Sequence, residues 1–317
     1  MAAAALLLAA CTTGGTASQS PQIQPVSTAA SPSAGAAAFP ITLVDDEETS
    51  VGIKAEPQRI ASLSPANTET VYALGAGDRL VGGTASDDFP AEAAALPDVA
   101  TFDGVNMEQL VAADPDLVLA AGNGLNKTAD IARIRELGIP VLVLYPDDVP
   151  GVLDDIQLIG DAIGKSDEAE AMTSAMQARI DDISAAAAAV PQPRTFYELG
   201  ADPELYGPTD DSFVADMITL AGGEPITTGS PTVSSLSLER LVDQDPEVIV
   251  LGDANYGTTV DQVVARPGWN VMSAVKSGAI RPVDDIVVTR PGPRLADGLA
   301  DLALAIHPDL VLPSPAP

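Results

Sequence analysis

Residues 166–190 read SDEAEAMTSAMQARIDDISAAAAAV, and the rest of the chain is organised around this stretch. Its apolar residues recur every three or four positions, which is the pattern of one continuous amphipathic helix. Ser166 is suited to cap the start, and Pro191 stops the run. At about 1.5 Å per residue the helix would be roughly 37 Å long. That length fits a spine that joins two lobes, or a long helix packed on one domain.

An internal repeat on either side of this helix favours the two lobes. Residues 106–120 read NMEQLVAADPDLVLA, and residues 237–251 read SLERLVDQDPEVIVL. The two align without a gap at an offset of 131 residues, so that Glu108 matches Glu239. Each copy predicts a short helix, an Asp-Pro turn and a buried strand, because proline cannot continue the helix and Val, Ile and Leu follow it.

Strand and helix patterns alternate on both sides of the spine, which predicts parallel sheets covered on both faces. The fold class is therefore α/β, with two Rossmann-like lobes joined by one long spine helix. A hairpin is expected between Ile41 and Ile53, and a last helix from Arg294 to Ile306. The expected segments are a signal with lipobox at 1–11, a tether at 12–40, lobes at 41–163 and 193–313, and the spine at 164–192.

Composition excludes several kinds of partner. The chain has 317 residues, of which 46% are hydrophobic, so it can bury one or two substantial cores. Its net charge of −30 argues against nucleic acid and against an anionic membrane surface, since both would be repelled.

The N-terminus has the pattern of a lipoprotein signal. Residues 1–10 are almost wholly Ala and Leu, and Leu8-Ala-Ala-Cys11 has the form of a lipobox, in which Cys11 is lipidated after cleavage. Ser, Thr, Gly, Ala and Pro then dominate up to Ala38, as in a flexible tether. The alternative is an apolar start with an incidental thiol. We expect an extracytoplasmic protein held to the membrane by a lipid anchor.

Several motifs in this order and spacing carry a resemblance that spans nearly the whole mature chain. The chain resembles the cobalamin and iron-siderophore substrate-binding proteins of bacterial ABC importers. That resemblance implies two α/β lobes bridged by a single helix, with the ligand in the cleft between them. The motifs are SLSPANTE (62–69), LGAGDRLVG (74–82), NME with DPDLV (106–118), LAGG (220–223), LERL with DPEVI (238–249) and PGPR (291–294).

The resemblance gives Glu108 and Glu239 a role. In the family, the matching carboxylates dock on arginines of the two permease subunits, and charge-assisted pairing with arginine supplies both energy and register. A glutamate near a helix N-terminus can also simply complement the helix dipole.

The resemblance also implies a set of cleft positions. Where the family's cobalamin-binding member has aromatic side chains, this chain has Ser86, Phe102, Tyr206 and Val233. Phe102 and Tyr206 could stack on a flat macrocycle or a catecholate, or be ordinary core residues. Arg290 and Arg294 could meet a ligand carboxylate or amide, although Arg294 could equally cap local carbonyls. Tyr256 and Trp269, in the loop region after the strand of the second repeat, are further candidates.

Other chemistry has little support in the sequence. The single histidine, His307, ends the last helix, where a cation suits the helix dipole. Bare zinc or manganese sites favour clustered His and carboxylates, and this chain has one histidine. We therefore expect no metal site and no cofactor. The acidic pairs Asp87-Asp88 and Asp284-Asp285 are expected to be solvated, and no catalytic motif predicts an enzyme.

The sequence therefore predicts a monomeric, non-enzymatic receptor for a cobalt or iron chelate, either a corrinoid or a ferric siderophore. Its expected partners are the chelate and an ABC permease dimer with its ATPase. The alternatives are a lipid-anchored sensor or interaction protein on the same fold, and a haem-binding member of the family.

Overall fold

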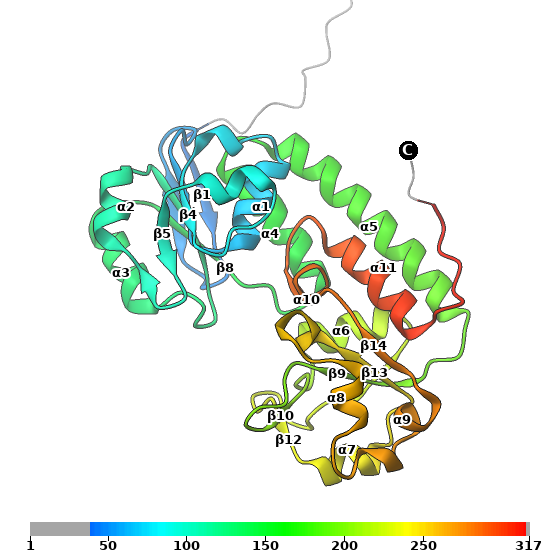
Figure 1. Ribbon diagram of the computed structural model, residues 1–317. Helices are drawn as coiled ribbons and strands as arrows, with labels where there is room; N and C mark the ends of the chain where they lie inside the picture. The colour runs from blue at the N-terminus through cyan, green and yellow to red at the C-terminus, as the bar shows by residue number, and fades with distance from the viewer. Residues whose placement is uncertain (1–38, 315–317) are drawn as a thin grey trace, which may run out of the picture. The chain divides into compact units, whose positions relative to one another are not determined.

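The computed structural model describes residues 39–314, so Cys11, the predicted signal and nearly all of the tether lie outside the described residues. Within this range are two separate sheets built largely of parallel strands and flanked by helices (Figure 1). The predicted α/β class is confirmed. None of the helices in residues 39–314 combines the length and apolar content that a membrane crossing requires.

The first half is built on a six-stranded sheet with the order β6-β5-β4-β3-β7-β8. Its pairs are parallel except for β5 with β6, and β3, β7 and β8 are buried along their whole length. The predicted hairpin is present as the antiparallel pair β1 and β2. The elements are β1 (Ile41–Val44), β2 (Ser50–Ile53), β3 (Ile60–Ser62), α1 (Pro65–Ala73), η1 (Gly77–Arg79), β4 (Leu80–Thr84), η2 (Ala91–Ala95), β5 (Asp98–Thr101), β6 (Gly104–Val105), α2 (Met107–Ala113), β7 (Leu117–Ala121), α3 (Thr128–Glu136), β8 (Val141–Leu144) and α4 (Val149–Ala162).

The second half is built on a four-stranded, wholly parallel sheet with the order β11-β9-β13-β14. A short antiparallel pair, β10 with β12, lies outside this sheet. The elements are β9 (Arg194–Glu198), β10 (Leu205–Tyr206), α6 (Phe213–Leu220), β11 (Glu224–Pro225), β12 (Ser235–Leu236), α7 (Leu238–Gln244), β13 (Val248–Leu251), η3 (Gly252–Tyr256), α8 (Val260–Val264), η4 (Trp269–Val271), α9 (Ser273–Ser277), β14 (Ile280–Pro282), α10 (Asp285–Thr289) and α11 (Leu295–Ile306).

The predicted spine is helix α5 (Ser166–Ala188), which packs against α4 and α11 (Figure 1). Ala169, near its start, belongs to the apolar core of the first sheet. Met176 and Ile180 belong to the core around α11. Met172 lies between them and contacts both cores. One helix thus contributes to the cores of both halves.

Both ends of α5 differ slightly from the prediction. Lys165 holds the N-cap position that Ser166 was expected to hold, and the helix ends at Ala188 and not at Val190. Val190 precedes Pro191, and a residue before proline is disfavoured in the helical region. The early end therefore follows from the proline.

The internal repeat is present in the structure as α2 with β7 and α7 with β13. Asn106 and Ser237 cap the two helices, each side chain accepting a hydrogen bond from a backbone N–H three residues later. The Asp-Pro turns also match, because Asp114 and Asp245 end the helices in the left-handed region, with φ of 48° and 43°.

An arginine stabilises each of these turns. Arg59 Nε donates to the carbonyl of Asp114 at 2.8 Å, and Arg194 Nε donates to the carbonyl of Gln244 at 3.0 Å. The orphan carbonyls at the end of each helix thus receive a charged donor. The sequence repeat is a repeat of hydrogen bonding as well.

Candidate ligand-binding cleft

A cavity of 170 Å³ lies at the carboxyl edge of the first sheet. The segments that follow β3, β4, β5 and β7 meet there, as loops do at the carboxyl ends of parallel strands. Its lining residues include Ser64, Thr84, Ser86, Phe102, Leu125 and Asn126. Loops from four strands thus form one wall.

Asn126 joins two of these loops. Its side-chain oxygen accepts from the backbone N–H of Ala121 at 2.7 Å, and its Nδ2 donates to the carbonyl of Leu63 at 3.1 Å. The side chain is buried, with 8% of its surface exposed. The segments after β3 and β7 are therefore held in register by one amide.

A second cavity, of 210 Å³, adjoins the first and draws residues from both halves of the chain. The two share Ser64, Pro65, Ala121 and Leu125. On the far side the second cavity is lined by Tyr145, Asp155, Ile156 and Ile159, and by Arg290 and Pro291 from the segment between α10 and α11. We call the two cavities together the cleft.

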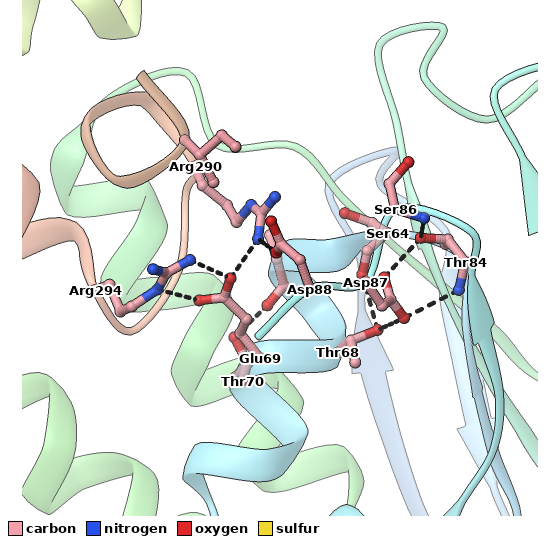
Figure 2. Close-up of polar contacts among 12 residues, drawn as sticks. Ser64, Thr68, Glu69, Thr70, Thr84, Ser86, Asp87, Asp88, Arg290 and Arg294 are labelled. Atoms are coloured by element: carbon pink, nitrogen blue, oxygen red, sulfur yellow. Dashed lines mark hydrogen bonds and ion pairs between the residues drawn. The ribbon is translucent and has the colours of Figure 1, made fainter. Parts of the chain in front are cut away.

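Arg290 and Arg294 are already engaged in ion pairs with the first half (Figure 2). Arg294 forms a bidentate pair with Glu69, at 2.9 Å from Nε to Oε2 and 2.7 Å from Nη2 to Oε1. Arg290 Nη1 donates to Glu69 Oε1 at 2.6 Å and to Asp88 Oδ1 at 2.7 Å. We call these four residues the arginine–carboxylate cluster. The sequence pointed to both arginines as ligand contacts, or to Arg294 as a cap of local carbonyls, and gave no sign that Glu69 and Asp88 are their partners.

The cluster keeps both arginines charged. Burial lowers the pKa of Arg290, but hydrogen bonds to Asp88 and Glu69 more than offset it, so its pKa lies above the ordinary value. For Arg294 the hydrogen bonds to Glu69 have the largest influence and raise its pKa as well. Arg294 also lies over the Phe89 ring, 4.2 Å from its centroid.

Asp87 fixes the loop that carries Asp88 and Ser86 (Figure 2). Its carboxylate accepts from Thr68 Oγ1 at 2.8 Å, from the Thr84 backbone N–H at 3.0 Å and from Thr84 Oγ1 at 2.6 Å. The expectation that both acids are solvated was wrong for Asp87, which is 6% exposed. Asp88 is exposed, as expected, and is also ion-paired with Arg290. Asp87 can be buried because two threonine hydroxyls and a backbone N–H donate to its carboxylate.

Asp155 is a buried acid at the cleft wall. Burial is the main influence that raises its pKa, to about 8, and Asp46 adds to the shift. Asp46 itself accepts from the backbone N–H of Tyr145 at 2.6 Å. Asp155 is therefore largely protonated at neutral pH, when it can donate a hydrogen bond.

The predicted aromatic positions are not all alike. Phe102 is fully exposed at 100% and lines the cleft beside Ser86. Tyr206 on β10 is half-buried. Val233 is exposed, and so is Tyr256, the last residue of η3. Neither tyrosine lines the two cavities described above.

Trp269 is a core residue and not a ligand contact. The sequence suggested it as a ligand contact, but it is 5% exposed and belongs to the core with Met272 and Val263. The Arg266 guanidinium lies 4.6 Å from its ring centroid, and Arg266 is paired with the buried Glu198 at 2.6 Å. Protein surrounds the ring, so Trp269 does not face the ligand.

A family model described as periplasmic binding protein matches residues 60–286 of the chain. The chain belongs to this family. This match and the relatives described next confirm the predicted likeness to substrate-binding proteins of ABC importers.

Two curated relatives and one solved structure illustrate the likeness. An uncharacterized ABC transporter substrate-binding lipoprotein of Bacillus subtilis, YvrC, is 34% identical over 86% of this chain and 87% of its own length. A cobalamin-binding protein of Halobacterium salinarum is 32% identical over 86% of this chain and 75% of its own. The periplasmic haem-binding protein RhuT of Roseiflexus sp. is 25% identical with a TM-score of 0.70, covering 79% of this chain and 98% of its own.

The docking candidates Glu108 and Glu239 occupy equivalent positions in the two halves. Both are exposed and lie in the first turns of α2 and α7, which belong to different halves of the chain (Figure 1). Their place in the repeat is what the sequence alignment predicted. Their role in docking remains a prediction.

Proposed function

We propose that this protein is the extracytoplasmic solute-binding component of an ABC importer. It captures a metal chelate in the cleft and delivers it to the permease. The observation that carries the proposal is the cleft itself, where loops from four strand ends of one half meet Arg290 and Pro291 of the other. Family membership and the relatives' names support the transport role.

A corrinoid is the first candidate for the ligand. The relative from Halobacterium salinarum is a cobalamin-binding protein by name and matches most of this chain. Phe102 supplies a free aromatic face at the cleft, which suits stacking on a flat macrocycle. A ferric siderophore is the second candidate, and haem the third, since RhuT is a haem-binding protein by name.

We further propose that Cys11 carries the lipid anchor and that Glu108 and Glu239 seat the protein on a two-fold permease. Two exposed carboxylates at equivalent places of a structural repeat can make two equivalent contacts with a symmetric partner. The two glutamates support this arrangement only jointly, because one contact would not specify the orientation.

The experiment is isothermal titration calorimetry of the full chain in detergent against cyanocobalamin, a ferric hydroxamate, a ferric tricatecholate and haem. Tight one-to-one binding of cyanocobalamin is the expected result. If only a ferric chelate binds, the protein serves iron uptake, and its transport role is unchanged. Silence toward all four would contradict the proposal and favour the sensor alternative.

A further inference from the structure

The arginine–carboxylate cluster cancels the positive charge that the cleft would otherwise offer. It contains two guanidinium groups and two carboxylates, and both oxygens of Glu69 are used by arginine. Glu69 is only 3% exposed, so water screens its pairs with the two arginines little. An anionic ligand group that sought Arg290 or Arg294 would have to displace an internal carboxylate first.

No second basic side chain in the described part of the chain compensates along the cleft. Among residues 39–314, Arg290 is the single basic residue that lines its two cavities. A third cavity shares Tyr145, Pro146 and Asp155 with the cleft and is lined by Asp46, Asp147, Asp148 and Asp154 as well. A fourth shares Asp147 and Asp148 with the third and adds Asp210, Asp211 and Asp216. The cavities that continue from the cleft beyond Asp155 are therefore lined by negatively charged side chains.

The arginines keep some hydrogen-bonding capacity even though their charge is compensated. Within residues 39–314, the bonds of Arg290 to Glu69 and Asp88 use one nitrogen, Nη1. Its Nε and Nη2 can still donate to an uncharged acceptor, such as an amide or hydroxamate carbonyl. The cleft can thus hydrogen-bond a ligand without offering it a net positive charge.

We infer that the cleft selects chelates that carry no net negative charge, and that Glu69 and Asp88 set this selectivity. The inference rests on the proposed function and narrows its ligand class. Amide-rich corrinoids and neutral or cationic ferric hydroxamates fit. Haem, with its two propionates, and ferric tricatecholates do not, because their negative charges would meet paired arginines and be repelled by the aspartates that line the cavities beyond Asp155.

The test compares two ligands that differ in one charge. Cyanocobalamin and its monocarboxylic acid, in which one peripheral amide is replaced by a carboxylate, are titrated into the full chain. We expect the wild-type protein to bind the neutral form at least about tenfold more tightly. The Asp88→Asn variant removes a half-exposed carboxylate whose one ion-pair partner within residues 39–314 is Arg290. It should therefore keep the fold and bring the ratio of the two affinities toward one.

A second variant and a control make the test specific. Glu69→Gln should shift the ratio further than Asp88→Asn, provided that circular dichroism shows it folded. Glu56→Gln removes the same charge from a pair with Arg79, at 2.7 Å, that lines neither cavity of the cleft, and it should leave the ratio unchanged. An equal shift in all variants would mean that only net charge matters, and the inference would be wrong.

The remaining outcomes separate this inference from the proposed function. If cyanocobalamin is not bound, the same comparison uses a cationic ferric hydroxamate against a ferric tricatecholate. Binding of haem or the tricatecholate alone overturns the charge selectivity but leaves a chelate receptor. If no chelate binds, both the charge selectivity and the proposed function are wrong.

Discussion

Glu69 on α1 receives the guanidinium of Arg294 in a bidentate ion pair, although the two residues are 225 positions apart in the chain. The pair joins the helix that follows the first strand of one sheet to the cap of the last helix of the other half. Arg294 adds a contact with Phe89, so its planar group is held by hydrogen bonds on one edge and by an aromatic ring on one face.

Arg294→Lys should destabilise the protein although it keeps the charge. Lysine cannot form the bidentate pair with Glu69 or cover Phe89 with a planar group, so we expect a loss of about 1–3 kcal/mol in the free energy of unfolding. Chemical denaturation measures it. Arg133→Lys, at an exposed position on α3, is the control and should change little. An unchanged midpoint for Arg294→Lys would mean that the pair contributes nothing to stability.

Asp155→Asn should stabilise the protein and flatten its pH dependence. The pKa of Asp155 is raised to about 8 in the folded state, whereas an unfolded aspartate has a pKa of about 3.9. Between these values the unfolded chain binds fewer protons, so stability falls as pH rises through this window. We expect a gain of roughly 1–3 kcal/mol at pH 7.

Unfolding curves between pH 4 and pH 9 check this prediction. Asp154→Asn is the matched control, because it removes the same charge from the exposed neighbouring position. If both variants gain equally, the effect is one of net charge and the burial of Asp155 is irrelevant to it.

Glu108→Ala combined with Glu239→Ala should abolish uptake in cells while leaving ligand affinity within about twofold. The two side chains are exposed on α2 and α7, and neither lines the cleft. The control is the double change Glu136→Ala and Glu170→Ala, which removes two exposed carboxylates from α3 and α5. Normal uptake by the first double variant would disprove the docking assignment.

Phe102→Ala should weaken binding of a flat chelate by about tenfold and leave the unfolding midpoint unchanged. The ring is fully exposed, so its removal costs no core packing, whereas a stacked ligand loses its aromatic face. Calorimetry measures the affinity, and Val311→Ala, at another exposed apolar residue, is the control. Unchanged affinity would place the ligand elsewhere in the cleft.

Much of the fold follows from local pattern. The spacing of Met172, Met176 and Ile180 predicts a helix because one face of it must be apolar, and the structure buries that face. The Asp-Pro turns at Asp114 and Asp245 are equally local, since proline ends the helix wherever the chain goes next. The lipid anchor at Cys11 and the domain boundaries stay predictions.

The partners of Arg290 and Arg294 depend on contacts between distant parts of the chain. Sequence could single out both arginines and even the motif that contains Glu69, but it carries no signal that these groups meet. The burial of Trp269 and Asp87 likewise could not be predicted from the sequence, because it depends on which surfaces the two sheets and their loops cover.

The sequence by itself therefore determined the elements, the repeat and the family, because helix periodicity, proline stops and capping act over a few residues. Only the tertiary structure decided which charges in the cleft are already paired. Ion pairing depends on distance in space, and chain closure over more than 200 positions brings together groups that no local pattern relates.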